Sequence, residues 1–251
     1  MNDLIPMDEC PVVILARPQM AENIGATARA MMNCGLRDLR IVNPRDGWPN
    51  AVALPMAAGG KSIIETVQVF DSLAEAAHDI SFMVAATARQ RDMPIRASEP
   101  RAIVDELVQK AKKGRVALLF GPEASGLDNN EVVLADVAVS AALNPDYPSL
   151  NLAQAVLLLA WEWRVAALFD LGSASQSDDF DENLATIKER DYFFQRLENA
   201  LDESGFFTSA EMAPAVKRNI RALINRATPS RQEINTLHGI IQALTSQRRD
   251  R

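Results

Sequence analysis

The chain has 251 residues, 48% of them hydrophobic and 24% charged, which is ordinary for a globular protein and enough for one domain or two. Its formal charge of -7 argues against a protein that coats nucleic acid through bulk charge, so any RNA contact must be local. Two cysteines, two histidines and no long uninterrupted apolar run predict a cytoplasmic protein without a disulfide framework, zinc site, signal peptide or membrane span.

Short runs rich in β-branched residues alternate with helical patterns over the first 170 residues. We predict strands at 12–16, 39–42, 67–70, 80–86, 115–120 and 137–141. This alternation is typical of an α/β fold in which a mostly parallel sheet has helices on both faces.

The first helix is predicted at 23–34 and ends at Gly35, a residue suited to the left-handed position after a helix. The segment 151–169 is long, apolar and rich in Leu, Ala and Trp, and we predict that it forms a buried helix. Two pairs have capping-box spacing and mark further helix starts, namely Ser72 with Glu75 and Asp128 with Glu131.

The composition changes after residue 170. Residues 171–180 are small and polar, as in a linker, and only helical patterns follow, at 181–203, 208–226 and 230–247. The capping pairs here are Thr208 with Glu211 and Ser230 with Glu233. We therefore predict an α/β domain at 1–170, a linker at 171–180 and a small helical extension at 181–251.

Several familiar nucleotide signatures are excluded. Gly60-Lys61-Ser62 resembles the end of a phosphate-binding P-loop, but Pro55 stands where its first glycine should be. No Gly-x-Gly-x-x-Gly follows a predicted strand, which argues against a dinucleotide fold and the usual glycine-rich methyltransferase loop. Neither histidine lies beside a nucleophile in a recognisable elbow, so a Ser/His/Asp hydrolase is unsupported.

Three predicted strands end in loops that could bind a ligand. Gly121 and Gly126 bracket one loop, in which Glu123 is suited to accept backbone N–H bonds. Ala86-Thr87-Ala88 and the segment 141–149, with its two prolines, form the others. Ligands of open α/β sheets bind outside the carboxyl ends of strands, so these loops either line one small-molecule pocket or are ordinary turns.

Asn23 and Arg29 lie among small residues in the first predicted helix. Asn23 suits either a helix cap or a functional role. Arg29 is either a surface charge or a planar fork for a phosphate or a developing oxyanion. Farther along, a stretch without acidic residues is either a solvated helix face or an RNA contact, and its cations include Lys217, Arg218, Arg221 and Arg226.

Three segments carry a family resemblance when taken in order: Asn23-Ile-Gly-Ala-Thr-Ala-Arg29, Phe120-Gly-Pro-Glu-Ala-Ser-Gly-Leu127 and Ser149-Leu-Asn-Leu-Ala153. Together they resemble the signature motifs of SpoU/TrmH RNA 2'-O-ribose methyltransferases, a branch of the SPOUT class. The segment Asn144-Pro-Asp-Tyr-Pro-Ser-Leu-Asn151 and the tail at 223–239 are similar to the bacterial TrmJ subtype. That subtype methylates the pyrimidine at position 32 of the tRNA anticodon loop.

The resemblance implies a deep trefoil knot between roughly residues 80 and 168, and a homodimer in which Arg29 of one subunit meets the cofactor pocket of the other. S-adenosylmethionine would bind against Ala86, Thr87, Ala88, Gly121, Ala141, Pro148, Ser149 and Leu150. Pro148 departs from the small polar residue that relatives often have there. This departure affects the polar contacts of the loop more than the pocket itself.

The chemistry requires activation of a ribose hydroxyl. Arg29 acts either as a general base or as a phosphate clamp and oxyanion stabiliser, and we favour the clamp because arginine has a pKa above about 12. We expect Ser149 and Asn151 to orient the hydroxyl, while Glu123 and Asn23 hold the loops. The alternatives are an enzyme acting on ribosomal RNA, a non-catalytic knotted module that binds RNA or cofactor, and a flavodoxin-like or nucleotide-binding oxidoreductase.

Overall fold

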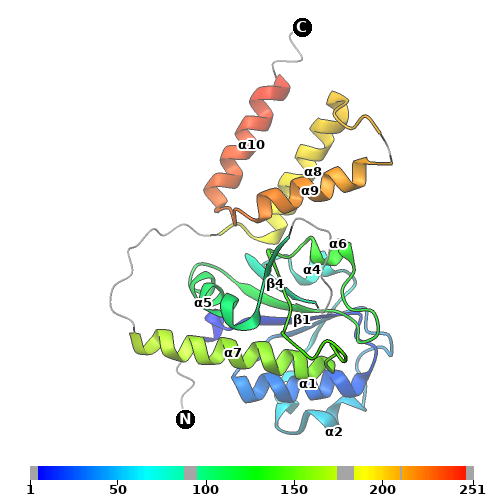
Figure 1. Cartoon of the computed structure of the whole chain (residues 1–251), viewed down its shortest axis with the longest axis vertical. Coiled ribbons are helices and arrows are strands. Elements are labelled where there is room, and N and C mark those ends of the chain that lie inside the picture. Colours follow the sequence, from blue (N-terminus) through cyan, green and yellow to red (C-terminus); the bar gives the residue numbers. More distant parts are fainter. Residues whose placement is uncertain (1–4, 88–94, 174–183, 210, 247–251) are drawn as a thin grey trace.

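A seven-stranded parallel sheet forms the centre of the protein, in a computed structural model that describes residues 5–87, 95–173, 184–209 and 211–246 (Figure 1). The strand order is β3-β2-β1-β6-β4-β7-β5, and all six neighbouring pairs are parallel. The strands are β1 (Val12–Ala16), β2 (Leu39–Val42), β3 (Gln68–Phe70), β4 (Phe82–Ala86), β5 (Arg96–Ser98), β6 (Val116–Phe120) and β7 (Val137–Val139).

The sequence predicted six of these strands, and β1 and β2 have the predicted bounds. The predicted strand at 137–141 ends earlier, at Val139. Strand β5 was not predicted, because Arg96 and Ala97 are exposed and the segment has no apolar run. An edge strand pairs on one side only, and here β7 supplies the whole partnership.

Helices lie on both faces of the sheet, as predicted. They are η1 (Met7–Glu9), α1 (Ala21–Cys34), α2 (Ala53–Ala57), η2 (Ala58–Gly60), α3 (Lys61–Glu65), α4 (Leu73–Ala76), α5 (Pro100–Ala111), α6 (Asn129–Val132) and α7 (Leu152–Ser173). The first face packs against α1, α5 and α7, and the second against α4 and α6. Successive residues of β1 alternate between these two cores and all are buried, as expected for a parallel strand covered on both sides.

The small residues of α1 serve a close approach of backbone. A Cβ atom at Gly25 would overlap the carbonyl oxygen of Ala53, and one at Gly60 would lie 2.6 Å from the carbonyl oxygen of Ala28. The surface of small residues predicted on this helix is therefore occupied by the backbone of α2 and η2. Helix α1 ends at Gly35 with a φ of 80°, which confirms the predicted left-handed residue.

Helix α7 is buried on one face only, although the sequence predicted a buried helix. Its residues 152–171 are long and apolar enough to cross a membrane by length and composition, yet the helix packs against α1 and α5. Trp163 is fully buried, whereas exposed apolar residues recur every three or four positions and form a second face. That face, called the α7 face below, comprises Leu157, Trp161, Val165 and Leu168.

A unit of three helices follows, formed by α8 (Ile187–Ser204), α9 (Ala213–Asn225) and α10 (Arg231–Ser246). The pair Ser230 and Glu233 makes the two predicted capping hydrogen bonds at the start of α10. The cap at Thr208 is wrong, because α9 begins at Ala213 after Met212. Helix α8 begins at 187 and not at 181, since Thr186 and Glu189 form a capping box that we did not predict. Helix α7 continues to Ser173, and linker residues 174–180 lie outside the described residues.

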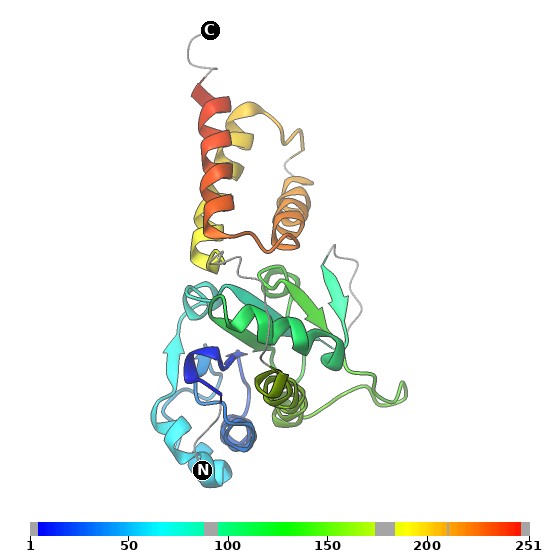
Figure 2. The same ribbon diagram turned by 90° about the vertical axis from the view of Figure 1, so that its left-hand side faces the viewer.

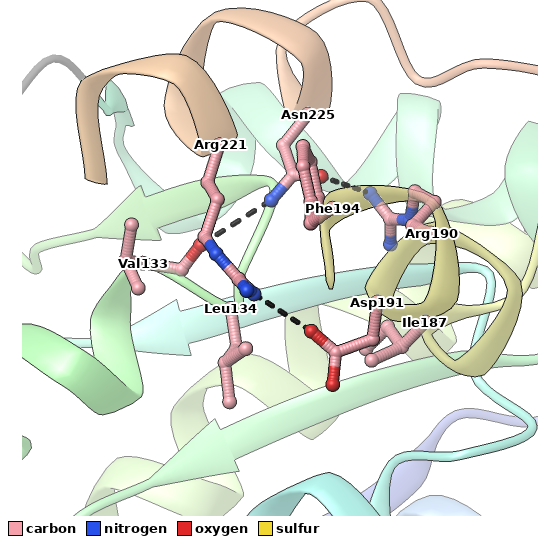
Figure 3. A pocket seen from close by; sticks show the side chains of 8 residues that line it. All are labelled: Val133, Leu134, Ile187, Arg190, Asp191, Phe194, Arg221 and Asn225. Atoms are coloured by element: carbon pink, nitrogen blue, oxygen red, sulfur yellow. Dashed lines mark hydrogen bonds and ion pairs between the residues drawn. The ribbon is translucent and has the colours of Figure 1, made fainter. Parts of the chain in front are cut away.

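Arg190 on α8 anchors this helical unit to the sheet. Figure 3 shows its hydrogen bond with Asn225 of α9. Its buried guanidinium donates hydrogen bonds to Asp136 Oδ1 at 2.5 Å, to Asn225 Oδ1 at 3.0 Å and to the Ser81 carbonyl oxygen at 3.3 Å. Asp136 also accepts the backbone N–H of Met83 at 2.8 Å. One ion pair therefore joins α8, α9 and the two strands β4 and β7.

The helical unit packs at the amino ends of the strands. The Ile187 N–H donates to the carbonyl oxygen of Ile80 at 2.6 Å, and Ile187 belongs to the core on the second face of the sheet. Residues 80 and 81 precede β4, and Asp136 precedes β7. Figures 1 and 2 show the three helices together at one end of the molecule, with α1 and α2 at the other.

We expect Arg190→Leu to lower the free energy of unfolding by about 3–5 kcal/mol, because it leaves the buried Asp136 carboxylate without its cation. Urea unfolding followed by circular dichroism measures this change. Lys61→Ala removes an exposed i,i+4 pair with Glu65 and should change stability by less than about 0.5 kcal/mol. A loss at Arg190 no larger than this control would contradict the anchoring role.

Candidate functional site

A cavity of about 510 Å³ opens at the carboxyl ends of β4, β6 and β7, between the loops that follow them and the start of α7. Its volume is within the range of small-molecule sites, roughly 300–1,000 Å³. Its lining includes Ala86, Thr87, Gly121, Ala141, Pro148, Ser149 and Leu150, which the sequence proposed together. Ala88, proposed with them, lies outside the described residues.

Gly121 allows the 121–127 loop to fold back on itself. A Cβ atom at Gly121 would overlap the backbone nitrogen of Leu127 and lie 2.5 Å from the carbonyl carbon of Gly126. Gly126 has a φ of +65°, and its N–H donates to the Pro122 carbonyl oxygen at 2.8 Å. Glycine permits a close approach of other atoms or a positive φ. Gly126 has the positive φ, and at Gly121 the loop's own backbone makes the close approach.

Three side chains from the three motif segments form one hydrogen-bonded chain. Asn23 Nδ2 donates to Glu123 Oε1 at 2.7 Å, and Asn151 Nδ2 donates to Asn23 Oδ1 at 2.8 Å. Asn151 Oδ1 in turn accepts the backbone N–H of Ala153 at 2.9 Å, at the start of α7. These hydrogen bonds hold together residues that are up to 128 positions apart in the sequence.

This chain decides between the two interpretations of Asn23. Helix α1 has Met20 as its N-cap, and Asn23 lies buried in the first turn without a capping bond. The capping role is therefore wrong, and Asn23 instead joins two loops. Asn151 has protein partners on both its amide nitrogen and its oxygen, which leaves it one N–H for a substrate.

Gln19 belongs to this site and was missed by the sequence analysis. Its backbone N–H donates to Glu123 Oε2 at 2.8 Å, and its side-chain oxygen accepts the Ala124 N–H at 3.2 Å. Both carboxylate oxygens of Glu123 are thus held by donors from residues 19–23. A polar residue in the short connection before α1 carries no spacing signal that would have identified it.

Arg17 fixes the far end of the same loop. It has a φ of 49°, and its guanidinium pairs with Asp128 at 3.2 Å and with Glu131 at 2.8 Å. Burial raises the pKa of Glu131. Burial also opposes ionisation of Asp128, but the Glu131 N–H and the Arg17 guanidinium outweigh it and lower the pKa of Asp128. These two carboxylates form the predicted capping box of α6.

Arg29 is exposed on α1 and is not among the described residues that line the cavity. Asn23, six residues earlier in the same helix, is buried, so the two side chains lie in different surroundings. Within the described ranges, no group of three or more His, Cys, Asp or Glu side chains is arranged to hold a metal ion.

The basic stretch of α9 is free of acids in sequence but not in space. Lys217 pairs with Asp202 at 2.9 Å, and Arg221 pairs with two acids of α8, Asp191 at 2.7 Å and Glu198 at 2.8 Å. Figure 3 shows Arg221 reaching Asp191 beside the anchor of α8. Arg221 thus holds α9 to α8, and Arg226 is the cation of the proposed RNA contact that is most open to solvent, with Arg218 half-buried.

Comparison with known proteins places this geometry among RNA methyltransferases. Residues 11–161 match the SpoU rRNA Methylase family, and residues 188–251 match the C-terminal domain of tRNA methyltransferase TrmJ. The tRNA (cytidine/uridine-2'-O-)-methyltransferase TrmJ of Sodalis glossinidius is 38% identical, over 92% of this chain and 90% of that protein.

Solved structures show the same similarity. The crystal structure of TrmJ from Z. mobilis ZM4 is 38% identical, covers 94% of this chain and 99% of its own, and has a TM-score of 0.83. A more distant SpoU methyltransferase, AviRb from Streptomyces viridochromogenes, was solved with the cofactor AdoMet. It shares the fold at 18% identity and a TM-score of 0.52, over 66% of this chain and 63% of its own.

We expect Gly121→Ala to lower the free energy of unfolding by about 1–3 kcal/mol, since its methyl group overlaps backbone that cannot rotate away. Gly239→Ala is the matched control. Gly239 lies in α10 with open space around it, so alanine there should raise stability by about 1 kcal/mol. Urea midpoints measure both changes. Equal stability of wild type and Gly121→Ala would show that the loop tolerates a side chain.

Proposed function

This chain belongs to the SpoU methylase family, and from that membership we infer that it is a tRNA 2'-O-methyltransferase that uses S-adenosylmethionine. The observation that carries the inference is the chain of Glu123, Asn23 and Asn151, which joins all three motif segments beside a cavity of suitable size. We propose the pyrimidine at position 32 of the anticodon loop as its target. The tRNA relatives favour this substrate over ribosomal RNA.

The cavity has the features that S-adenosylmethionine requires. Apolar side chains such as Leu143, Leu152 and Leu158 offer a slot for the adenine, and the backbone of the 120–126 and 139–143 loops offers N–H and carbonyl groups for the polar parts. When bound, this cofactor supplies a methyl group on a positively charged sulfur. The protein must therefore position the ribose hydroxyl in line with that methyl group and exclude water.

Ser149 and Arg29 are the residues that we assign to the ribose. Ser149 lines the cavity beside Asn151, so that its hydroxyl and the remaining Asn151 N–H are available to orient the 2'-hydroxyl. A guanidinium stays charged near neutral pH, so we give Arg29 the role of a phosphate clamp that also stabilises the developing oxyanion. Glu123 and Asn23 hold the loops through their hydrogen bonds to each other, to Gln19 and to Asn151.

We propose that the site is completed in a homodimer. Arg29 lies outside the lining of its own subunit's cavity. Helix α7, which lies beside α1 (Figure 1), presents an exposed apolar face. Contiguous apolar patches on soluble proteins mark contact sites. We propose that the α7 faces of two subunits pack together and that this packing brings Arg29 of one subunit to the cavity of its partner.

We propose three further features of this protein: a knot, two domains and a cytoplasmic location. A trefoil knot at 80–168 is supported by the way the 120–127 and 139–150 loops and the start of α7 gather around one cavity. The division into an α/β domain and a helical extension is supported by the separate family matches at 11–161 and 188–251, with α7 extending past residue 170 to Ser173. A tRNA substrate and the anchored position of α7 within the fold support a cytoplasmic protein.

The proposed function is tested by incubating the protein with S-adenosylmethionine and a pyrimidine-32 tRNA transcript, then mapping ribose methylation. We expect methylation at position 32 and tight calorimetric binding of S-adenosylmethionine, with no binding of flavin or NAD. Binding without methylation of any RNA would favour the non-catalytic module. Binding of flavin or NAD would favour an oxidoreductase.

Arg29→Lys distinguishes the two roles of this residue. A clamp depends on a planar fork that lysine lacks. We therefore expect the single-turnover rate of Arg29→Lys to be about 100-fold below that of the wild type at every pH from 7 to about 10. S-adenosylmethionine affinity, measured by calorimetry, should be unchanged and serves as the control. Recovery of the wild-type rate toward pH 10 would instead support a general base.

Trp161→Glu tests the dimer. Placing a charge at the centre of the α7 face should convert the dimer to a monomer in light scattering and abolish methylation. Leu244→Glu changes an apolar residue of comparable exposure in the last turns of α10 and should remain dimeric and active. A monomeric wild type, or a Trp161→Glu dimer with normal activity, would contradict the shared site.

A further inference from the structure

The helical unit lies at the amino ends of the strands, and the cavity lies at their carboxyl ends. Ala86, Phe120 and Val139 end the strands that open into the cavity, whereas Ile80, Ser81 and Asp136 at the other end bond to α8. Five-residue strands such as β4 separate the two ends by about 17 Å. An RNA whose target nucleotide lies at the cavity of one subunit can therefore contact that subunit's helical unit only with another part of the RNA.

One cluster on this unit has the composition of a nucleotide contact. Tyr192 of α8 is 64% exposed, and its ring lies 5.4 Å from the ring of His238 on α10. His238 also packs edge-on against the buried Phe193 at 5.5 Å. Arg196, one turn after Tyr192, donates from Nη1 to His238 Nδ1 at 3.4 Å. We call Tyr192, Arg196 and His238 the Tyr192 patch.

The charges around the patch favour an anionic partner. Three acids of α8 pair with other cations: Glu189 pairs with Arg231 at 2.7 Å, and Asp191 and Glu198 pair with Arg221. Arg196 forms no ion pair within the described residues. Burial and the nearby Arg196 lower the pKa of His238, which leaves an uncharged ring for stacking at neutral pH. The patch therefore presents two aromatic rings and a guanidinium whose charge is not neutralised.

We propose that the Tyr192 patch stacks on an unpaired nucleotide of the tRNA that lies outside the methylated loop. Exposed aromatic rings beside arginine are the means by which proteins hold unstacked bases, and the guanidinium can contact the adjoining phosphate. A protein partner of mainly apolar character would leave Arg196 without a function. This inference rests on the proposed function and adds the part of the tRNA that the helical unit recognises.

Substitution is the appropriate test, because a chain shortened before α8 would lose Arg190 and leave Asp136 unpaired. Methylation is measured with the full-length dimer on two substrates, an intact tRNA transcript and its isolated anticodon stem-loop. We expect Tyr192→Ala to raise the KM for intact tRNA about 10-fold and to leave the KM for the stem-loop unchanged. Tyr192→Phe keeps the ring and should behave as wild type.

Phe206→Ala is the matched control, because Phe206 is a 53% exposed aromatic residue elsewhere in the same unit. It should change neither KM. An unchanged KM for intact tRNA in Tyr192→Ala overturns the inference and leaves the patch to a protein contact, and an equal rise on both substrates overturns the remote location. Failure of the wild type to methylate either RNA would instead remove the proposed function.

Discussion

The carboxylate of Glu123 is the point on which the candidate site depends. One oxygen accepts from the side chain of Asn23 and the other from the backbone of Gln19, while Asn23 in turn accepts from Asn151. Gln19 lies in the connection between β1 and α1, Asn23 lies in α1, and Asn151 lies in the connection between β7 and α7. A partly buried carboxylate with fixed donors is a strong organiser, since charge-assisted hydrogen bonds are shorter and stronger than neutral ones. The loops around the cavity are consequently held before any ligand arrives, as preorganised catalysis requires.

A second ionic interaction, between Arg190 and Asp136, organises the opposite edge of the sheet. Because Asp136 also bonds to Met83, the strands β4 and β7 that open into the cavity are tied at their amino ends to α8. The helical unit is thus fixed to the sheet through Arg190 and through Ile187, which packs in the core on the second face, although its family match is separate. The cavity thus lies at the carboxyl ends of the strands, and the helical unit lies at their amino ends.

Sequence patterns succeeded where the signal is local. Gly35 ends α1, the Asp128 and Glu131 capping box starts α6, and β1 and β2 have their predicted bounds, because caps and apolar periodicity act within a few residues. They failed where a distant element decides. Strand β5 exists because β7 offers it an edge, and Arg221 is neutralised by acids that lie 23 and 30 residues away on α8. No local pattern in the chain carries that information.

The sequence by itself determined the parallel α/β class, the three motif segments and the residue types that meet at the cavity, since ordered motifs at the ends of apolar strands converge at one edge of a parallel sheet. Only the tertiary structure decided what these residues do to one another. Asn23 became a bridge rather than a cap, Gly121 a site of backbone contact, and Gln19 a partner of Glu123. The reason is physical: the hydrogen bonds of Asn23, Glu123 and Gln19 join segments about a hundred or more residues apart, and folding alone sets those distances. The contact at Gly121 depends on how the 121–127 loop turns back on itself.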